Sequence, residues 1–407
     1  MPVLSINSPA AGTYFHVFDT VFVNVNVSDE LNIEWLKLDI ISAQNTIVVA
    51  SQVRTDFSSL SESVNQPLII DNIHIESGTF HVRATVSDGT NENYAFREIH
   101  IFEVPLERMK VYAVSNPTTS TTRIDSLSSN EFVSATEWGQ QANIAAVNSW
   151  DGELMVIGEN SGDILMLSGE ELIPTETIAG LGNGPNPDYN NTEFHPDFHQ
   201  YFSSRFVGEM EIRRAGGSAH SGFNTTSGFR PFSLEPVNSE IIIEERNLAG
   251  TDTYVSAYNR NSGALLTSLA LNGELVEITH DGDQIWLWGN SDSQGKLWLF
   301  DSVTGFITEV YAFGTSLGLI RDAVAQPDGR VGVVFLANSM IVDPGMQPSF
   351  GTLWDYGGDE IDYDEDGNDY LVRNGETLYI LAPGDNNPHA QITVPQNTFE
   401  ILILYNK

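Results

Sequence analysis

The chain has 407 residues with 55 acidic and 18 basic side chains, so its formal net charge at pH 7 is −37. Such a charge repels phosphate groups and anionic lipids, which argues against nucleic acid and membrane surfaces as partners. The chain contains no cysteine, which excludes disulfides, thiolate metal sites and cysteine nucleophiles. No segment approaches the ~20 consecutive apolar residues of a membrane-spanning helix. A chain of this length exceeds one ordinary hydrophobic core, so we expect two domains.

Residues 1–104 have the pattern of a small β-sandwich, with about seven short strand-like segments bounded by Ser, Asn, Asp and Gly. The clearest segment alternates and presents four valines on one face: Val21, Val23, Val25 and Val27. The run SGTFHVRATVSDG at 77–89, followed by a strand at 98–102, resembles the last hairpin of bacterial immunoglobulin-like, cadherin-like and PKD-type modules. This resemblance implies an extracellular or cell-surface protein in which the domain is a spacer or an adhesive module. The first residues do not look like a signal peptide, which such a protein would already have lost.

Residues 105–407 repeat a unit of four strands. The clearest copy spans 274–314, and the turn Asp281-Gly282 joins its first two strands. Related turns recur after one or two intervals of about 38 to 47 residues each, which is the length of a β-propeller blade. They lie at 151–152, 238–239, 328–329 and 366–367. We therefore predict a β-propeller of about seven blades, and leave six or eight open because residues 182–230 are irregular.

The two ends of this region are expected to complete one blade. Residues 398–405 form a strand with no successor, and 110–114 begin a repeat without its leading strand. A propeller ring needs such a pairing, because its edge strands otherwise stay open. In general shape the region resembles bacterial propellers of the quinoprotein and WD-like type, although it has no series of Trp-Asp dipeptides.

A run of alternating carboxylates is the sharpest local motif. It contains four aspartates at 362–369: Asp362, Asp364, Asp366 and Asp369. The run resembles the calcium loops of EF-hand-like and integrin-type propeller repeats, which implies Ca²⁺ as a cofactor. It departs from them because Arg373 stands where a bidentate Glu is needed and Asp369 comes one residue early. We prefer the simpler interpretation that Asp366-Gly367 is the recurrent hairpin turn of a very acidic protein.

The irregular segment contains the candidate catalytic residues His195, His199 and Tyr201. Two histidines four residues apart suit a metal ion only on a helix, and Pro196 argues against a helix here. No third ligand is evident in the neighbouring sequence. A zinc site at this pair is therefore the less favoured interpretation.

Several side chains could bind a ligand in or near the same segment. The arginines form a basic stretch suited to an anionic ligand such as a uronate or a sulfated glycan: Arg205, Arg213, Arg214 and Arg230. We slightly prefer the alternative that they neutralise neighbouring acidic strands. Trp150, beside a hairpin turn, is a candidate exposed ring. The tryptophans at 286, 288 and 298 are assigned to the core.

These patterns favour a non-catalytic, exported protein that recognises a protein or a glycan through the face of the propeller. The sequence has no nucleophile elbow, phosphate loop or nucleotide fingerprint. One alternative is a carbohydrate-active enzyme, namely a lyase of acidic polysaccharides. In that case an arginine neutralises the uronate while His195, His199 or Tyr201 moves the proton. The third alternative is a structural component of a larger surface assembly.

Overall fold

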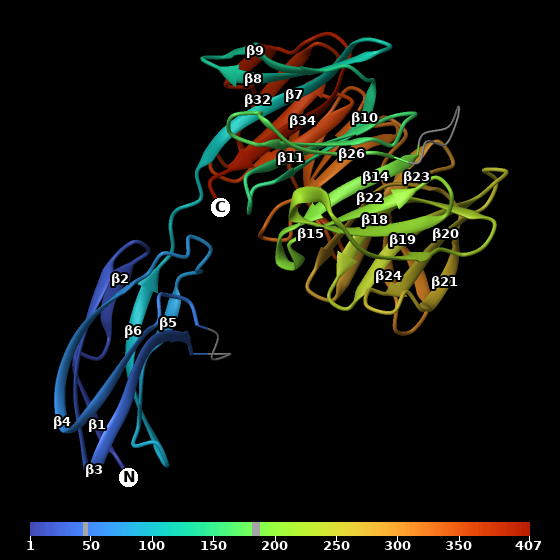
Figure 1. The fold of residues 1–407 in the computed structure, drawn as a ribbon. Helices are drawn as coiled ribbons and strands as arrows, with labels where there is room; N and C mark the ends of the chain where they lie inside the picture. The colour runs from blue at the N-terminus through green and yellow to red at the C-terminus, as the bar shows by residue number, and fades with distance from the viewer. Residues whose placement is uncertain (44–47, 181–187) are drawn as a thin grey trace. The chain divides into compact units, whose positions relative to one another are not determined.

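The computed structural model describes residues 1–43, 48–180 and 188–407 (Figure 1). These residues form an all-β protein, in which the two helical turns, Pro196–Phe198 (η1) and Ala215–Gly217 (η2), are 3₁₀ helices. The chain divides into two compact units, Met1–Pro105 with Lys407, and Leu106–Asn406. Within the described ranges, no helix has the length and apolar character needed to span a membrane.

The first unit contains one six-stranded sheet in the order β1-β3-β5-β6-β2, with β4 paired to β3. Its strands are β1 (Val3–Ser8), β2 (Thr13–His16), β3 (Thr20–Ser42), β4 (Val53–Ile69), β5 (Gly78–Ser87) and β6 (Glu92–Phe102). The 23 residues of β3 pair with β4 along most of their length, with β1 at the start and with β5 at the end. This continuous strand explains why the described part of the unit has six strands where the sequence suggested about seven.

The alternating valines of β3 lie in the core of the first unit. Val21, Val23 and Val25 are 0% exposed and pack in one cluster with Val82 of β5. Successive side chains of a strand point to opposite faces, and Phe22 accordingly is 60% exposed. Burying each valine side chain contributes about 1.5–3 kcal/mol. The predicted one-sided strand is therefore confirmed.

The described residues of the second unit form seven four-stranded sheets. We call the strand that begins each sheet order its first strand. The first strands are β10 (Ala142–Asn148), β14 (Tyr189–His195), β18 (Phe229–Val237), β22 (Glu274–Asp281), β26 (Ile320–Ala325), β30 (Glu360–Asp364) and β34 (Thr398–Tyr405). The second strands are β11 (Glu153–Gly158), β15 (Gln200–Arg205), β19 (Glu240–Asn247), β23 (Gln284–Ser291), β27 (Val331–Phe335), β31 (Asp369–Asn374) and β7 (Arg108–Thr118).

The outer strands complete the same seven sheets. The third strands are β12 (Ile164–Ser168), β16 (Glu209–Arg214), β20 (Thr253–Asn259), β24 (Gln294–Asp301), β28 (Ser339–Asp343), β32 (Thr377–Leu381) and β8 (Thr121–Ser128). The fourth strands are β13 (Pro174–Ile178), β17 (Ala219–Asn224), β21 (Leu265–Leu271), β25 (Phe306–Ala312), β29 (Ser349–Trp354), β33 (Ala390–Thr393) and β9 (Glu131–Trp138). Six sheets use consecutive strands, whereas the seventh takes β34 from the end of the unit and β7, β8 and β9 from its start.

The two ends of the second unit meet in that seventh sheet. Strand β34 pairs antiparallel with β7, and Ile401 lies opposite Ala113. The strand at 398–405, which has no successor in the sequence, predicts this pairing. It leaves neither end of the unit as a separate edge.

The first strands contact one another in a closed circle, which we call the strand ring. Strand β10 contacts β14, and the contacts continue through β18, β22, β26 and β30 to β34, which contacts β10 again. Figure 1 shows β14, β18 and β22 close together, and the contacts place β18 between the other two. Because every sheet repeats the same order, the ends of the first strands that lead into the first hairpin turn lie at the same end of the ring.

The segment that the sequence suggested to be an irregular insertion is a regular sheet. Strands β14, β15, β16 and β17 pair antiparallel in chain order. The first turn of this sheet contains η1 instead of an Asp-Gly pair, which concealed the repeat in the sequence. Residues 181–187, which belong to the same expected insertion, lie outside the described residues.

Tryptophans fill the space between neighbouring sheets. Trp286, Trp288 and Trp298 are 1%, 0% and 5% exposed. The buried Trp288 Nε1 donates a hydrogen bond to Thr279 Oγ1 at 2.9 Å, so its polar atom is satisfied. The prediction that these rings belong to the core is confirmed.

Candidate metal site in the strand ring

The β14–β15 hairpin separates the two histidines that the sequence grouped together. The 3₁₀ turn η1 lies between them, and His199 has a left-handed backbone with φ of 50°. Gln200, not His199, therefore lies opposite His195 across the hairpin. His199 is exposed and its ring lies 3.8 Å from that of Trp150, whereas His195 is buried. The two histidines do not share a metal position.

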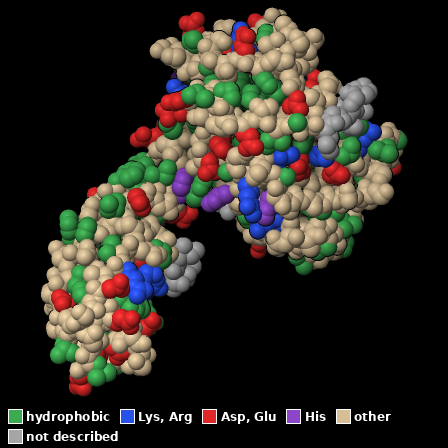
Figure 2. All heavy atoms as spheres, in the orientation of Figure 1, with side chains coloured by type: hydrophobic (Ala, Val, Ile, Leu, Met, Phe, Trp, Pro, Cys, Tyr) green, Lys and Arg blue, Asp and Glu red, His purple; other side chains and the backbone are tan. Residues whose placement is uncertain are grey.

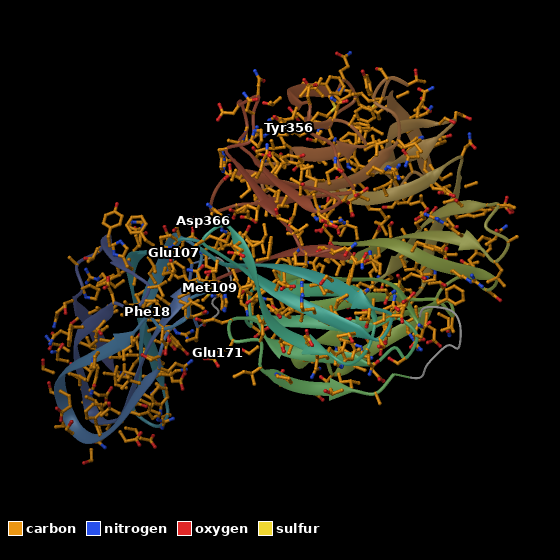
Figure 3. All side chains as sticks on the ribbon, turned by 90° about the horizontal axis from the view of Figure 1, so that it is seen from above. Phe18, Glu107, Met109, Glu171, Tyr356 and Asp366 are labelled. Atoms are coloured by element: carbon orange, nitrogen blue, oxygen red, sulfur yellow. The ribbon has the colours of Figure 1, made fainter. Side chains whose placement is uncertain are left out.

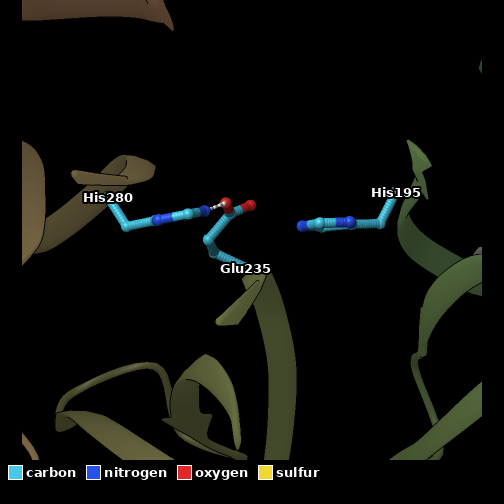
Figure 4. Close-up of side chains that lie close together, drawn as sticks. All are labelled: His195, Glu235 and His280. Carbon is cyan, nitrogen blue, oxygen red and sulfur yellow. Dashed lines mark ion pairs between the residues drawn. The ribbon is translucent and has the colours of Figure 1, made fainter. Parts of the chain in front are cut away.

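His195 instead meets Glu235 and His280, which come from the next two first strands of the ring. One potential ligand atom from each residue lies within 4.8 Å of the other two. His280 Nε2 is 3.3 Å from Glu235 Oε1, and Figure 4 shows both histidine rings directed toward the carboxylate. In the part of the chain that the structure describes, no other group of three or more His, Cys, Asp or Glu side chains converges in this way.

The spacing of these atoms suits a small transition-metal ion. Ligands held about 2.0–2.1 Å from a tetrahedral zinc ion lie about 3.3 Å apart, which is the distance between Glu235 and His280. The His195 nitrogen, within 4.8 Å, needs to approach by at most about 1.5 Å. Two histidines and one carboxylate form a common ligand set for zinc and for ferrous iron, with further coordination positions left open.

An aromatic ring and the Glu235 carboxylate contact the two imidazoles of the cluster. The His195 ring stacks on Phe198 of η1, with ring centroids 4.4 Å apart. His280 Nδ1 is buried without a hydrogen-bond partner among the described residues, so the contact to Glu235 is the polar contact that positions this imidazole. The exposed fractions of the Glu235 and His280 side chains are 11% and 31%, which leaves the cluster accessible from the His280 side.

Burial raises the pKa of further carboxyl groups on the first strands, among them Glu193, Glu277, Asp322, Asp362 and Glu400. We call these five the axial carboxyl groups. Each is only partly exposed, because the neighbouring strands exclude most of the surrounding water. Glu193 precedes His195 by two residues, so both side chains point to the same side of β14, about 7 Å apart along the strand.

Burial and mutual repulsion perturb these carboxyl groups. Burial raises the pKa of Glu193 to about 7, of Asp322 to about 8 and of Asp362 to about 7. The pKa of Glu235 rises well above its ordinary value because of burial first, and then because of the charges of Glu193 and Glu277. Buried carboxylates in proteins are ordinarily paired with a base or bound to a metal ion.

One basic side chain reaches this group from within the described residues. Arg373 pairs with Glu360 at the start of β30, with Nε 2.5 Å from the carboxylate oxygen. Its charge also lowers the pKa of Glu400, against the larger opposite effect of burial. The remaining axial carboxyl groups have no basic partner in the described structure. The ring interior is thus an electrostatically negative environment for a cation.

Known structures share the fold of this chain. No family model and no curated protein matches the sequence. A functionally unknown protein from Desulfotomaculum acetoxidans is 12% identical, with a TM-score of 0.53, over 72% of this chain and 98% of its own. A β-propeller domain of Cps50 (Swd1) from Myceliophteria thermophila is 10% identical, with a TM-score of 0.50, over 64% of this chain and 89% of its own. The chain has a β-propeller-like fold.

A further similar structure is hydrazine synthase from Kuenenia stuttgartiensis, at 11% identity and a TM-score of 0.50, over 72% of this chain and 98% of its own. Identities this low establish the fold alone, since propellers host unrelated functions. The chemistry of the propeller-like unit must therefore be read from its own residues.

Sequence reasoning missed Glu235 and His280 because they lie in other repeats from His195. A usable signal was present. His195 and His280 both stand within a residue of the end of a first strand, immediately before the first hairpin turn of their repeats. Aligning the repeats by that turn brings the two histidines to the same end of the ring, where a third ligand could have been sought.

The arginines of the β14–β17 sheet serve as counter-charges. Arg205 Nη2 lies 3.0 Å from Asp188 and Nη1 lies 2.6 Å from Glu209. Arg213 Nη2 lies 2.7 Å from Glu211. Both arginines are buried, so they do not form the basic ligand surface considered from the sequence. Figure 2 shows Lys and Arg side chains in small groups among many Asp and Glu side chains.

The other arginines and Tyr201 also lie outside a common site. Arg214 is exposed, and the guanidinium carbon of Arg230 lies 3.7 Å from the ring centre of Phe206. Tyr201 is 0% exposed and packs against Phe194, with ring centroids 5.1 Å apart. Its hydroxyl therefore cannot contact a substrate in the described conformation.

Three aspartates of the expected calcium loop contact basic residues: Asp364, Asp366 and Asp369. Asp364 is buried and pairs with the Arg108 guanidinium, and Asp366 accepts a hydrogen bond of 3.1 Å from the Arg108 backbone N–H. Asp369 lies 3.3 Å from His389 Nε2. Figure 3 shows Asp366 beside the start of β7, and the fourth aspartate, at 362, is an axial carboxyl group. The segment forms the hairpin turn of the alternative interpretation, with Asp364 opposite Asp369.

Proposed function

We propose that the protein is a metal-binding β-propeller that holds a divalent transition-metal ion at His195, Glu235 and His280. The convergence of these three side chains within 4.8 Å, from three consecutive sheets, carries the proposal. Nothing in the strand pattern requires imidazole or carboxylate groups at these positions. Their meeting at one end of the ring is therefore better explained by a ligand than by folding.

The electrostatics of the ring support the same conclusion. Glu235 lies among Glu193 and Glu277, whose charges disfavour its ionised form. A bound divalent cation would lower the pKa of Glu235 and of the other nearby carboxyl groups, because its positive charge stabilises their ionised forms. Neutral imidazole nitrogens of His195 and His280 would complete the ligand set, and the remaining coordination positions would accept an oxygen ligand.

We further propose that the second unit is a closed seven-bladed propeller. The circle of contacts among seven first strands and the pairing of β34 with β7 support this assignment. The first unit is proposed to be an immunoglobulin-like module that acts as a spacer in an exported or cell-surface protein. The proposed role of the whole chain is recognition, with the metal ion as part of the recognition surface.

The acidic-polysaccharide lyase considered from the sequence does not gain support from the geometry. His195 lies in the ring, His199 against Trp150, and Tyr201 in the core. These groups do not gather around one substrate position.

Metal titration of the full chain tests the proposal. After removal of metal with EDTA and exchange into buffer, Zn²⁺ should raise the Tm, because a ligand that binds only the folded state stabilises it. The gain is about 2.7 kcal/mol when free zinc is a hundred times its Kd. Co²⁺ should give the visible absorption bands of a low-symmetry nitrogen and oxygen site.

Matched variants locate the ion. His195→Ala, Glu235→Gln and His280→Ala should each weaken zinc binding at least about 100-fold, whereas His199→Ala on the same hairpin should not. Calorimetry measures the stoichiometry and Kd. The absence of a Tm shift at millimolar zinc, or equal affinity in the Glu235→Gln variant, would overturn the assignment.

A further inference from the structure

A pocket of about 440 Å³ lies between two consecutive sheets of the propeller-like unit. The sheet β14–β17 supplies one wall, and the turn after β20 supplies the other. Seven residues line it: Phe198, Gln200, Ile212, His220, Ser221, Arg260 and Asn261. The size falls within the ~300–1,000 Å³ of small-molecule sites. Among these residues most are polar and none is acidic, in a chain with 55 acidic residues.

Arg260 is the charged group of this pocket. Its guanidinium carbon lies 3.5 Å from the ring centre of Phe198, and no carboxylate of the described residues forms an ion pair with it. Partial burial lowers the pKa of Arg260, and no neighbouring acid opposes that effect. By contrast, the nearby Arg205 and Arg213 both have carboxylate partners. Arg260 is thus a partly desolvated cation without an internal anion.

The pocket and the candidate metal site share a wall. The Phe198 ring that lies under Arg260 also stacks on His195, with centroids 4.4 Å apart. Gln200, which lines the pocket, is the residue opposite His195 across the β14–β15 hairpin. A molecule bound against Arg260 would therefore lie one aromatic ring away from the proposed metal ligand.

We propose that this pocket binds a small hydroxylated carboxylate of the uronic acid class, with the carboxylate on Arg260. A guanidinium presents paired N–H donors that match a carboxylate. Gln200, Ser221 and Asn261 offer side-chain donors and acceptors for hydroxyl groups. This site is separate from the metal site, and it goes beyond the function proposed above because it requires no metal ion.

Binding measurements with metal-free protein in EDTA test this site independently of zinc. Galacturonate and glucuronate are titrated into the full chain by calorimetry and by ligand-observed NMR, with glucose and sulfate as comparison ligands. Saturable uronate binding is expected, and glucose should bind at least about 10-fold more weakly because it cannot pair with Arg260.

Two arginine variants separate the pocket from general charge effects. Arg260→Ala should weaken uronate binding about 10- to 100-fold. Arg230→Ala is the matched control, because Arg230 also stacks on an aromatic ring, Phe206, but does not line the pocket. The Tm of each variant confirms folding, and Arg260→Lys keeps the charge if the alanine variant does not fold.

The proposal would be overturned by a lack of uronate binding to folded wild-type protein at about 50 mM, by equal binding to the Arg260→Ala variant, or by equal affinity for glucose. Binding of sulfate as tightly as uronate would overturn the carboxylate class. Zinc-dependent uronate binding that is absent in EDTA would also overturn this site, while leaving the metal site intact. Failure of zinc to bind, with uronate binding retained, would overturn the metal site alone.

Discussion

Strands β10 and β14 hold neighbouring places in the strand ring but differ in chemistry. Each has seven residues and a register shift after its first residue. Ala146 of β10 and Glu193 of β14 hold the same place, opposite Met155 and Phe202. The comparison shows that a small apolar residue meets the needs of a first strand.

A carboxyl group at the place of Ala146 therefore lowers the stability of the fold without being needed for packing. Burial raises the pKa of Glu193 to about 7, which means that its ionised form is disfavoured in the folded protein. Proteins depart from such local rules mainly at functional sites. The contrast between β10 and β14 thus separates residues that pack the ring from residues that are expected to have a function.

The largest effect is expected when the carboxyl group of β14 is introduced at the equivalent position of β10. Ala146→Glu should destabilise the protein by about 4 kcal/mol, because it adds a buried carboxyl group with no basic partner to an already negative ring. Urea unfolding measures the change. Ala146→Gln, which has similar size and no charge, separates the electrostatic cost from overpacking. If the two variants lose equal stability, the negative charge of the ring is not the cause.

A second test compares the strands that pair with β10 and β14, namely β11 and β15. Arg205 of β15 lies opposite Tyr189 where Gly158 of β11 lies opposite Ala142. Arg205→Ala should cost about 3 kcal/mol, because it leaves Asp188 buried without its cation. The exposed Arg214 is the control, and Arg214→Ala should change the free energy of unfolding by less than about 0.5 kcal/mol. A small effect at Arg205 would show that Asp188 finds another partner.

Removing a carboxyl group should have the opposite sign. Glu277→Leu should stabilise the metal-free protein at pH 8 by about 2 kcal/mol, since a hydrophobic residue replaces a carboxyl group whose pKa is raised well above its ordinary value by burial first, and then by the charges of Glu193 and Asp322. Calorimetric or urea unfolding in EDTA measures the gain. Leu68→Ala in the first unit serves as a reference for the ordinary loss on core truncation. Destabilisation by Glu277→Leu would mean that this carboxylate has a stabilising partner.

Stability should also depend on pH with a defined sign. Asp322 has a pKa of about 8 in the folded protein and an ordinary value of 3.8. The folded state therefore binds the extra proton between these values, so the free energy of unfolding rises as the pH falls from about 8 toward 4. Each such group contributes about 1.4 kcal/mol per pH unit.

Asp322→Asn removes one of these contributions. The slope of the free energy of unfolding between pH 5 and about pH 7 should become shallower by about 1.4 kcal/mol per pH unit. Urea titrations in EDTA at several pH values measure it. An unchanged slope would show that Asp322 remains ionised in the folded protein.

Much of the architecture follows from local patterns. The alternation of Val21, Val23 and Val25 predicts a one-sided strand, because the period of two is a property of the extended backbone itself. The Asp281-Gly282 pair marks a hairpin one residue early: Asp281 ends β22 opposite Gln284, and Gly282 adopts the φ of 57° that the tight turn requires. The spacing of such turns predicts repeated four-stranded sheets, and the unmatched final strand predicts the sheet that β34 and β7 complete.

Which side chains meet is decided by the tertiary structure. His195, Glu235 and His280 are separated by tens of residues, and each is unremarkable within its own repeat. They converge because the ring brings the same ends of consecutive first strands together. The packing of β14 and β15 likewise brings Arg205 to Asp188. Local sequence sets backbone angles and faces, whereas a site depends on distances between separate strands, which exist only after the sheets have packed.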